Sequence, residues 1–293
     1  MNSLRHPQYD EQDHETWRSF YREFGAHKES FQSIIHPFYA NNEGVLASLA
    51  DRVPTKAQID EILTPIGWSV QYVEGFVPIW MVADILSKKR LPIASKLRGK
   101  DEVFFASEPD LIHDIFGHLP SLFNAEYRGL LEKWAKKTMN LPITELDRCT
   151  YHLNKSIMRA EQRAKQSKSA MPRQSLKDLK RGAESLKRCL TQNPSPAYLA
   201  EKAYFWIFEF GIVAGSKPKV FGAGLISSMN EMKKISLLDF PFAPLSTTNL
   251  CNTSHVSQMQ DSYLVARDLS VFSSVIDVLT RPTLASEGHY FYG

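Results

Sequence analysis

The chain has 293 residues, of which 43% are hydrophobic, and this is enough to bury the core of one large domain or two small ones. Its net charge of +3 is too small to indicate nucleic-acid binding by itself. Its three cysteines lack the spacing of a disulfide framework or a thiolate metal site. The N-terminus is polar, and no run of about 18 apolar residues is present, so we expect a cytoplasmic protein without a membrane span.

Apolar residues repeat at helical spacing along most of the chain, and one short stretch alternates as a β-strand does. The aromatic pattern in residues 12–34 indicates a helix with a core-facing side, whereas residues 68–73 alternate between the two faces. Further helical patterns cover residues 79–87, 130–138, 199–214, 225–233 and 263–279. The predicted fold class is mainly α with a few short β-strands.

Two histidines stand out in the stretch Glu108-Pro-Asp-Leu-Ile-His-Asp-Ile-Phe-Gly-His-Leu-Pro120. Neutral imidazole is the commonest metal ligand in proteins. His113 and His118 are five residues apart, which is roughly 140° around an α-helix. They converge only if the helix ends before the second one, and Gly117 and Pro120 are where an ending is expected. The alternative is an unrelated pair, one packed and one solvated.

A single carboxylate, Glu209, lies within the nearly apolar stretch of residues 203–212. A buried carboxylate is costly unless it is paired, protonated or bound to a metal. Two histidines and one carboxylate form the facial triad that is typical of non-haem Fe(II) oxygenases. The alternative is a glutamate at a helix edge that pairs with a lysine.

Residues 155–188 carry most of the positive charge of the chain. They hold eleven Lys or Arg against three Asp or Glu, an excess of +8 that leaves −5 for the remainder. One interpretation is a solvated helical insertion or a mobile loop. The other is a docking surface for an acidic partner or for nucleic acid. No aromatic residues are interleaved for base stacking, which argues against nucleic acid.

On these residues the chain resembles the pterin-dependent aromatic amino acid hydroxylases, and most closely the bacterial phenylalanine 4-hydroxylases. Residues 108–120 resemble the iron-binding signature of the family, residues 208–211 the segment with the third ligand, and residues 221–228 the glycine-rich active-site loop. The resemblance implies the catalytic-domain fold of this family over residues 1–293. It also implies a basic insertion at about 150–195 and no N-terminal regulatory domain.

The resemblance implies a monooxygenase that hydroxylates the ring of an aromatic amino acid. Its cofactors would be Fe(2+) and tetrahydrobiopterin, with dioxygen as the oxidant and the pterin as the source of two electrons. Phenylalanine is the first choice of substrate, with tryptophan, or another ring position in secondary metabolism, as the alternative. A third possibility is a non-catalytic member whose basic insertion binds a partner. We expect a monomer.

The resemblance also gives individual residues their roles. The iron ligands would be His113, His118 and Glu209. Arg98 would grip the substrate carboxylate through two parallel hydrogen bonds, and Asp110 would orient this arginine. The alternative for Arg98 is a surface charge beside two lysines.

Other positions carry over in the same way. Ser227 would support the first iron-binding histidine, help to bind substrate and, together with Tyr204 and Glu209, serve catalysis. Tyr204 is otherwise a structural tyrosine of the core. Phe205 would line the substrate pocket. Asp114 would contact the pterin or lie on a solvated helix face.

The chain departs from the family pattern at three positions. Val82 stands where bacterial relatives have the aromatic residue that stacks on the pterin, and Trp80 or Phe76 could take its place as cofactor-binding residues. Ala106 replaces a threonine that helps to hold the amino acid. Phe205 replaces the tryptophan of phenylalanine hydroxylases, as in tryptophan hydroxylases, and its smaller ring widens the pocket.

Overall fold

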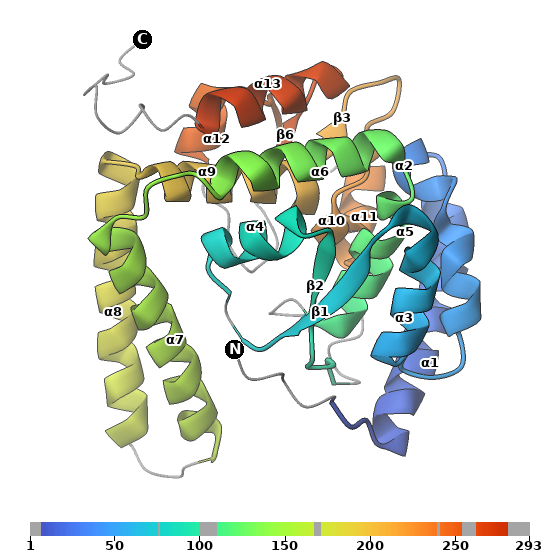
Figure 1. The fold of residues 1–293 in the computed structure, drawn as a ribbon, viewed down its shortest axis with the longest axis horizontal. Helices are drawn as coiled ribbons and strands as arrows, with labels where there is room; N and C mark the ends of the chain where they lie inside the picture. The colour runs from blue at the N-terminus through green and yellow to red at the C-terminus, as the bar shows by residue number, and fades with distance from the viewer. Residues whose placement is uncertain are drawn as a thin grey trace.

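The computed structural model describes residues 7–75, 77–99, 110–166, 171–238, 241–253 and 262–280, and Figure 1 shows their arrangement. The α-helices are α1 (Glu11–Phe31), α2 (Pro37–Ala40), α3 (Lys56–Leu63), α4 (Ile79–Ser87), α5 (Leu119–Leu122), α6 (Ala125–Thr138), α7 (Glu145–Gln166), α8 (Met171–Gln192), α9 (Pro196–Tyr204), α10 (Ala223–Ile226), α11 (Met229–Ser236), α12 (Thr247–Asn252) and α13 (Leu269–Leu279). Two 3-10 helices, η1 (Glu43–Leu49) and η2 (Thr64–Ile66), and two π-helical turns, η4 (His113–His118) and η5 (Phe205–Glu209), complete the helical elements.

The strands form three small sheets. They pair as β1 (Ser69–Val73) with β2 (Arg90–Ala94), β3 (Ile212–Val213) with β4 (Lys219–Val220), and β5 (Phe242–Pro244) with β6 (Tyr263–Val265). The first pair is parallel, and α4 supplies the crossover that parallel strands require. The predicted fold class, mainly α with a few short strands, is confirmed. Among the described residues, no helix is both long enough and apolar enough to cross a membrane.

The expected core-facing side of the first helix is present and packs against the histidine segment. Trp17 and Phe20 of α1 are fully buried. Their rings lie 5.2 and 4.8 Å from the ring of Phe116, which belongs to η4. From α2, the Tyr39 hydroxyl donates to the Phe116 carbonyl at 2.7 Å. The aromatic residues of α1 and α2 therefore hold η4 in place through its residue Phe116.

The C-terminal helical expectations were partly wrong. Residues 263–279 are not one helix, because Tyr263–Val265 pairs with β5 and α13 begins only at Leu269. Asp268 has extended backbone and its carboxylate accepts the backbone N–H of Ser270, so it is an N-cap that separates the two elements. Residues 199–214 likewise leave the α-helix after Tyr204, where η5 begins.

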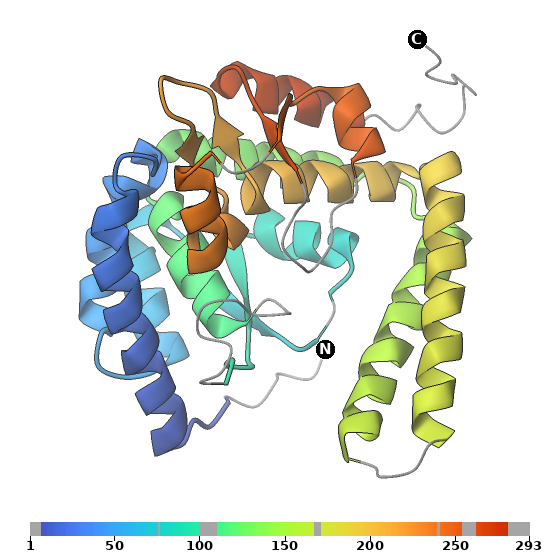
Figure 2. The ribbon, with the colours of Figure 1, turned by 180° about the vertical axis from the view of Figure 1, so that it is seen from behind.

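The basic segment is a helical hairpin formed by α7 and α8. Figures 1 and 2 show this pair standing beside the remainder of the fold, to which it connects at one end. At that end the Ser195 hydroxyl donates to the Asp147 carboxylate, so the two legs are joined at their base. Gly182 of α8 faces Leu153 of α7, where an added Cβ would make an ordinary contact at 3.4 Å. The described residues of the basic segment are therefore helical rather than a mobile loop.

Lys202 ties α12 to α9, the helix that leads to Glu209. The lysine is 2% exposed, and its ammonium donates to the carbonyls of Thr253 (2.8 Å) and Leu250 (3.3 Å). Burial lowers the pKa of Lys202 to about 8. In the unfolded chain it is near 10.4, so between about pH 8 and 10.4 the unfolded state binds more protons and stability rises with pH.

We expect this titration to be visible in the free energy of unfolding. Between about pH 7.5 and 9.5 the wild-type chain should gain up to about 2 kcal/mol relative to Lys202→Met, which lacks the group. Denaturant unfolding of both proteins at the two pH values measures the difference. Parallel pH dependences would show that Lys202 titrates as an exposed lysine does.

Candidate metal centre and active site

His113 and His118 meet because their helix is a π-helical turn. The i→i+5 hydrogen bonding of η4 places residues five apart nearly one above the other, which an α-helix does not. The two imidazole rings lie 5.3 Å apart. The expected helix ending at Gly117 and Pro120 is wrong, because η4 continues directly into α5 with Pro120 in its first turn.

Gly117 serves close packing instead of helix termination. A Cβ at this position would lie 2.7 Å from the carbonyl oxygen and 2.8 Å from the Cβ of Ala223. Any side chain would therefore push away the glycine-rich loop. Gly222 of that loop has a similar constraint, since its Cβ would lie 2.4 Å from the carbonyl oxygen of Glu209. The two glycines let the loop pack against both ligand-bearing turns.

Glu209 ends the second π-helical turn and lies between the two histidines. In η5 the backbone N–H of Phe210 donates to the carbonyl of Phe205 at 2.8 Å, five residues back. The Glu209 Oε2 atom lies 2.9 Å from His113 Nε2, and its Oε1 lies 3.1 Å from His118 Nε2. All three side chains are buried. The alternative of a helix-edge glutamate paired with a lysine is therefore wrong.

Each histidine is supported at its other ring nitrogen. His113 Nδ1 lies 2.9 Å from Asp114 Oδ1, and Asp114 Oδ2 accepts the backbone N–H of Ala94 at 2.6 Å. An ionised carboxylate only accepts, so Asp114 keeps a proton on Nδ1, and the proton on Nε2 that Glu209 accepts is the one that a metal ion would displace. His118 Nδ1 lies 3.3 Å from the Tyr127 hydroxyl. Asp114 is buried, so its expected place on a solvated helix face is wrong.

The charges of this cluster depend on one another. Burial lowers the pKa of His113, but the Glu209 charge and the hydrogen bonds to Asp114 and Glu209 raise it to about 10. Burial raises the pKa of Glu209, but His118 and His113 outweigh this effect and hold it well below its usual range. Burial, followed by the Glu209 charge, raises the pKa of the nearby Tyr204 phenol. A divalent cation could replace the protons that now neutralise the carboxylate.

A second set of ligand atoms is close enough to consider. Atoms of His113, Asp114 and His118 lie within 4.8 Å of one another. Asp114, however, faces the Nδ1 side of His113, whereas Glu209 faces Nε2 of both imidazoles. The atoms that could hold a metal ion at one point are therefore the two Nε2 atoms and the Glu209 carboxylate. The cysteines are free, two of them exposed on α7 and α8, and the third lies on α12.

Arg98 follows β2 and is fixed by Asp110 beside η4. The Arg98 Nε atom lies 3.1 Å from both oxygens of Asp110, and Nη2 lies 2.7 Å from Oδ1. Asp110 Oδ1 also accepts the backbone N–H of His113 at 3.0 Å, so one carboxylate ties Arg98 to the metal-binding turn. The ring of Phe20 lies 5.3 Å from the guanidinium carbon. Arg98 is 4% exposed, which excludes a surface charge.

Ser227 lies in the glycine-rich loop but not against a histidine. It is buried, and its hydroxyl donates to the Ala223 carbonyl at 2.8 Å. The expectation that Ser227 supports His113 is therefore wrong, because Asp114 occupies that place. Tyr127, which contacts His118, was missed from the sequence. The sequence indicates that Tyr127 lies in the first turn of α6, after the N-cap Asn124. It does not indicate which residue of another element the Tyr127 side chain contacts.

Of the aromatic-position candidates for pterin binding, the described residues Trp80 and Val82 are not brought together. Trp80 and Val82 are two residues apart on α4, about 200° around the helix, so they face different sides. The Trp80 ring meets the ring of Tyr151 in α7 edge-on, with centroids 6.0 Å apart. Val82 packs against the core. Phe76 and Ala106 lie outside the described residues.

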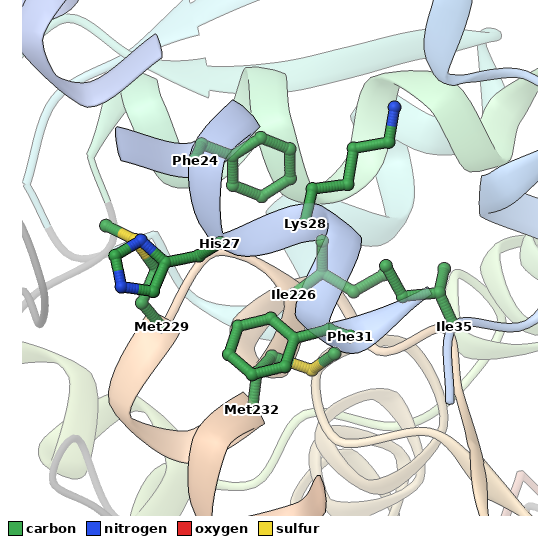
Figure 3. A pocket seen from close by; sticks show the side chains of 8 residues that line it. All are labelled: Phe24, His27, Lys28, Phe31, Ile35, Ile226, Met229 and Met232. Atoms are coloured by element: carbon green, nitrogen blue, oxygen red, sulfur yellow. The ribbon is translucent and has the colours of Figure 1, made fainter. Parts of the chain in front are cut away.

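Two hollows occur elsewhere on the described surface. The one in Figure 3 lies between α1, α10 and α11, with the His27 ring beside Met229 and the Phe31 ring beside Met232. Its volume is about 10 Å³, the lower limit for one water molecule. A wider hollow of about 600 Å³ lies beside the start of α3. Neither is lined by His113, His118 or Glu209, so neither lies at the candidate metal site.

The profile of the biopterin-dependent aromatic amino acid hydroxylases matches residues 2–165, more than half of the chain. The chain belongs to this family. The matched residues include both histidines, Arg98, Asp110 and Asp114. The recognition made from the sequence motifs is confirmed.

Similar hydroxylases extend the comparison to most of the chain. A phenylalanine-4-hydroxylase of Mesorhizobium japonicum is 22% identical over 262 residues, which cover 88% of this chain and 76% of that protein. One of Chromobacterium violaceum is 30% identical over 134 residues, 44% of this chain and 42% of that protein.

Solved structures of the family show the same fold. The apo phenylalanine hydroxylase of Colwellia psychrerythraea has a TM-score of 0.65 at 18% identity, covering 93% of this chain and 87% of that one. The C. violaceum enzyme with bound iron(III) and 7,8-dihydrobiopterin also has a TM-score of 0.65, at 21% identity, covering 92% and 80%.

Proposed function

We propose that this family member hydroxylates the ring of an aromatic amino acid, using Fe(II), dioxygen and tetrahydrobiopterin. Phenylalanine, converted to tyrosine, is the first choice of substrate. The observation that carries the proposal is the buried convergence of His113 Nε2, His118 Nε2 and the Glu209 carboxylate. The similar proteins named phenylalanine-4-hydroxylase support phenylalanine over tryptophan. A non-catalytic binding protein would have no need for this cluster.

The residues present fit an iron ion. Two imidazole nitrogens and one carboxylate form the donor set that suits Fe(II), and three protein ligands leave coordination positions open. Iron and tetrahydropterin, when bound, supply the redox chemistry: one oxygen atom enters the ring and two electrons reduce the other atom to water. Asp114 keeps the proton on His113 Nδ1, so that Nε2 stays available as a ligand.

Arg98 is proposed to bind the carboxylate of the amino acid. Asp110 occupies the Nε edge of the guanidinium, and it also accepts the backbone N–H of His113. The same carboxylate therefore sets the distance between the arginine and the metal-binding turn. A substrate held by its carboxylate would present its side chain at a fixed distance from the metal. Phe205, which packs against Tyr204 and Phe210, is proposed to border the ring.

The proposal is tested by turnover. Purified protein would be loaded with Fe(II) and supplied with tetrahydrobiopterin, dioxygen and each of phenylalanine and tryptophan, with products identified by mass and the ring position by NMR. We expect hydroxylation that requires both iron and pterin. Iron-loaded protein that oxidises pterin without hydroxylating either amino acid would reject the proposed substrate class.

We further propose that the protein works as a monomer in the cytoplasm. The three free thiols support a reducing compartment. Sedimentation of the purified protein would test the monomer.

Phe205 gives a prediction about substrate choice. It begins the turn that Glu209 ends, so a larger ring at this position would reduce the room beside the metal site. Differences of this size in a pocket are worth roughly 10- to 200-fold in kcat/KM. We expect measurable tryptophan hydroxylation by the natural protein, and Phe205→Trp should shift the kcat/KM ratio toward phenylalanine by about tenfold or more.

The comparison requires the same pterin and full iron loading for both proteins. Phe210→Trp is a matched control, because Phe210 is the neighbouring ring that stacks on Phe205 from outside the turn. If Phe205→Trp leaves the ratio unchanged, or moves it toward tryptophan, this residue does not set the size of the pocket.

A further inference from the structure

The outer face of α7 carries a line of basic side chains. Arg148, His152, Lys155, Arg159 and Arg163 are all exposed, and each follows the previous one by three or four residues. Residues at this spacing lie on one side of a helix. We call these five residues the basic stripe. At 1.5 Å per residue it extends for roughly 22 Å.

The other faces of α7 are already used. Tyr151 meets the Trp80 ring on α4, and Gly75 before α4 lies close to Met158, since a Cβ there would be 3.2 Å from the Met158 Cε. Glu161 pairs with Lys180 of α8 at 2.8 Å and so points to the second leg of the hairpin. The basic stripe is thus the face left to solvent once α7 has packed against α4 and α8.

Little within the described part of the chain neutralises the stripe. Arg148 is 3.9 Å from Glu145, whose side chain is 90% exposed, and such a pair is weak. Lys155 lies over the Tyr151 ring at 5.7 Å. No carboxylate of the described residues pairs with Arg159 or Arg163. Four permanent charges in a row on one helix repel one another, which favours a partner that brings opposite charge.

We propose that the basic stripe is a docking surface for a protein partner that presents an acidic helix. A carboxylate once per turn on such a helix would match the pitch of the stripe, and about 15 residues would match its length. Residues 155–188 carry a net charge of +8, and the remainder of the chain carries a net charge of −5. Electrostatic attraction for an acidic partner is therefore concentrated on this hairpin and does not extend over the whole molecule.

The surface suits a protein better than other polyanions. Tyr151, the aromatic residue beside the stripe, is partly buried against α4, so no ring is free to stack on a base. The exposed face of α8 mixes Asp178 and Glu184 with its lysines and arginines, so uninterrupted positive charge is confined to α7, along which a single helix can lie. The large hydrophobic side chains exposed in the described residues lie outside both helices, which leaves nothing to insert into a membrane.

The test uses the full chain and fluorescence anisotropy at about 0.15 M salt, where weak surface charge effects are screened. The probe is a labelled 20-residue alanine-based helix with glutamate at every third or fourth position along one face. Its isomer has the same composition, with the glutamates spread around all faces. A 20-base-pair RNA duplex and vesicles of anionic phospholipid are the other probes.

We expect the striped peptide to bind at least about tenfold more tightly than its isomer, and more tightly than RNA or vesicles. The variant Lys155→Gln/Arg159→Gln/Arg163→Gln should weaken binding by about tenfold or more. The matched control Lys177→Gln/Arg181→Gln/Arg188→Gln removes the same charge from α8 and should change the Kd by less than about twofold. Circular dichroism checks that both variants keep their helices.

Several results would overturn the proposal. Equal binding of the two peptide isomers would show that only net charge matters. Tighter binding of RNA or of vesicles would give the hairpin a different class of partner. If the α7 and α8 variants lost peptide affinity equally, the basic stripe would not be the binding site. If the protein instead self-associated in a salt-dependent way that the α7 variant abolished, the stripe would be a contact between copies of this chain. Hydroxylation is not involved in these readouts, so they stand apart from the proposed activity.

Discussion

Replacement of any one of His113, His118 and Glu209 by alanine should strip iron from the protein and abolish hydroxylation. The three side chains are buried around one position, and their Nε2 and carboxylate atoms already lie 2.9 and 3.1 Å apart. Each variant leaves only two ligands, and for Fe(II) two ligands do not provide the facial donor set. Iron content by atomic emission and turnover by product mass measure the two losses.

A graded series makes this prediction sharper. Asp114→Asn keeps all three ligands but replaces the carboxylate that fixes His113, and losses of this kind are typically about 10- to 100-fold in metal affinity or activity. His152→Ala is the matched histidine control, because His152 is exposed on α7. It should retain iron and activity. Stoichiometric iron and normal turnover in a ligand variant would remove the metal assignment.

The convergence of His113, His118 and Glu209 was predictable from the sequence, but the reason for it was not. A spacing of five residues does not suit an α-helix, and an early helix end was the available explanation. In the structure, η4 is a π-helical turn, which is wider than an α-helical turn, and His113 and His118 lie on one face of it. Glu209 is presented by a second such turn. Local hydrogen-bond register of this kind depends on tertiary packing, and single-sequence periodicity does not report it.

The support around the ligands was harder to predict than the ligands themselves. Ser227 was expected beside His113, yet Asp114 holds Nδ1 because its carboxylate also accepts from Ala94 at the end of β2. That contact joins residues far apart in the chain, and so does the contact of Tyr127 with His118. Apolar periodicity predicts which face of an element is buried, but not which polar groups meet across elements.

The charge count of the sequence identified the basic segment, and the structure shows which faces of its helices are packed and which are exposed. The excess of +8 marked residues 155–188 as unusual but left an insertion, a mobile loop and a docking surface open. The contacts of Tyr151 and Met158 with the α4 region show which side of α7 faces inward. Only then can the remaining basic side chains be assigned to one exposed line.

Loss of Arg98 should raise the KM for the amino acid far more than the KM for pterin. A charge pair that loses one partner in a desolvated site costs roughly 2–5 kcal/mol, which corresponds to about 30- to several-thousand-fold. Arg98→Ala also leaves the carboxylate of Asp110 without its guanidinium partner, although the backbone N–H groups of Arg98 and His113 still donate to it. Some loss of stability should therefore accompany the kinetic effect.

Two further variants separate substrate binding from stability. Arg98→Lys keeps the charge but loses the planar fork, so it should recover stability without restoring the KM for the amino acid. Arg98→Ala/Asp110→Asn removes both charges and so relieves the unpaired carboxylate, yet it should bind the amino acid as poorly as Arg98→Ala. Steady-state kinetics with each co-substrate varied in turn, alongside thermal unfolding, measures these effects. If the KM for the amino acid is unchanged in a folded Arg98→Ala protein, the substrate carboxylate binds elsewhere, and the link from Arg98 through Asp110 to His113 serves the fold alone.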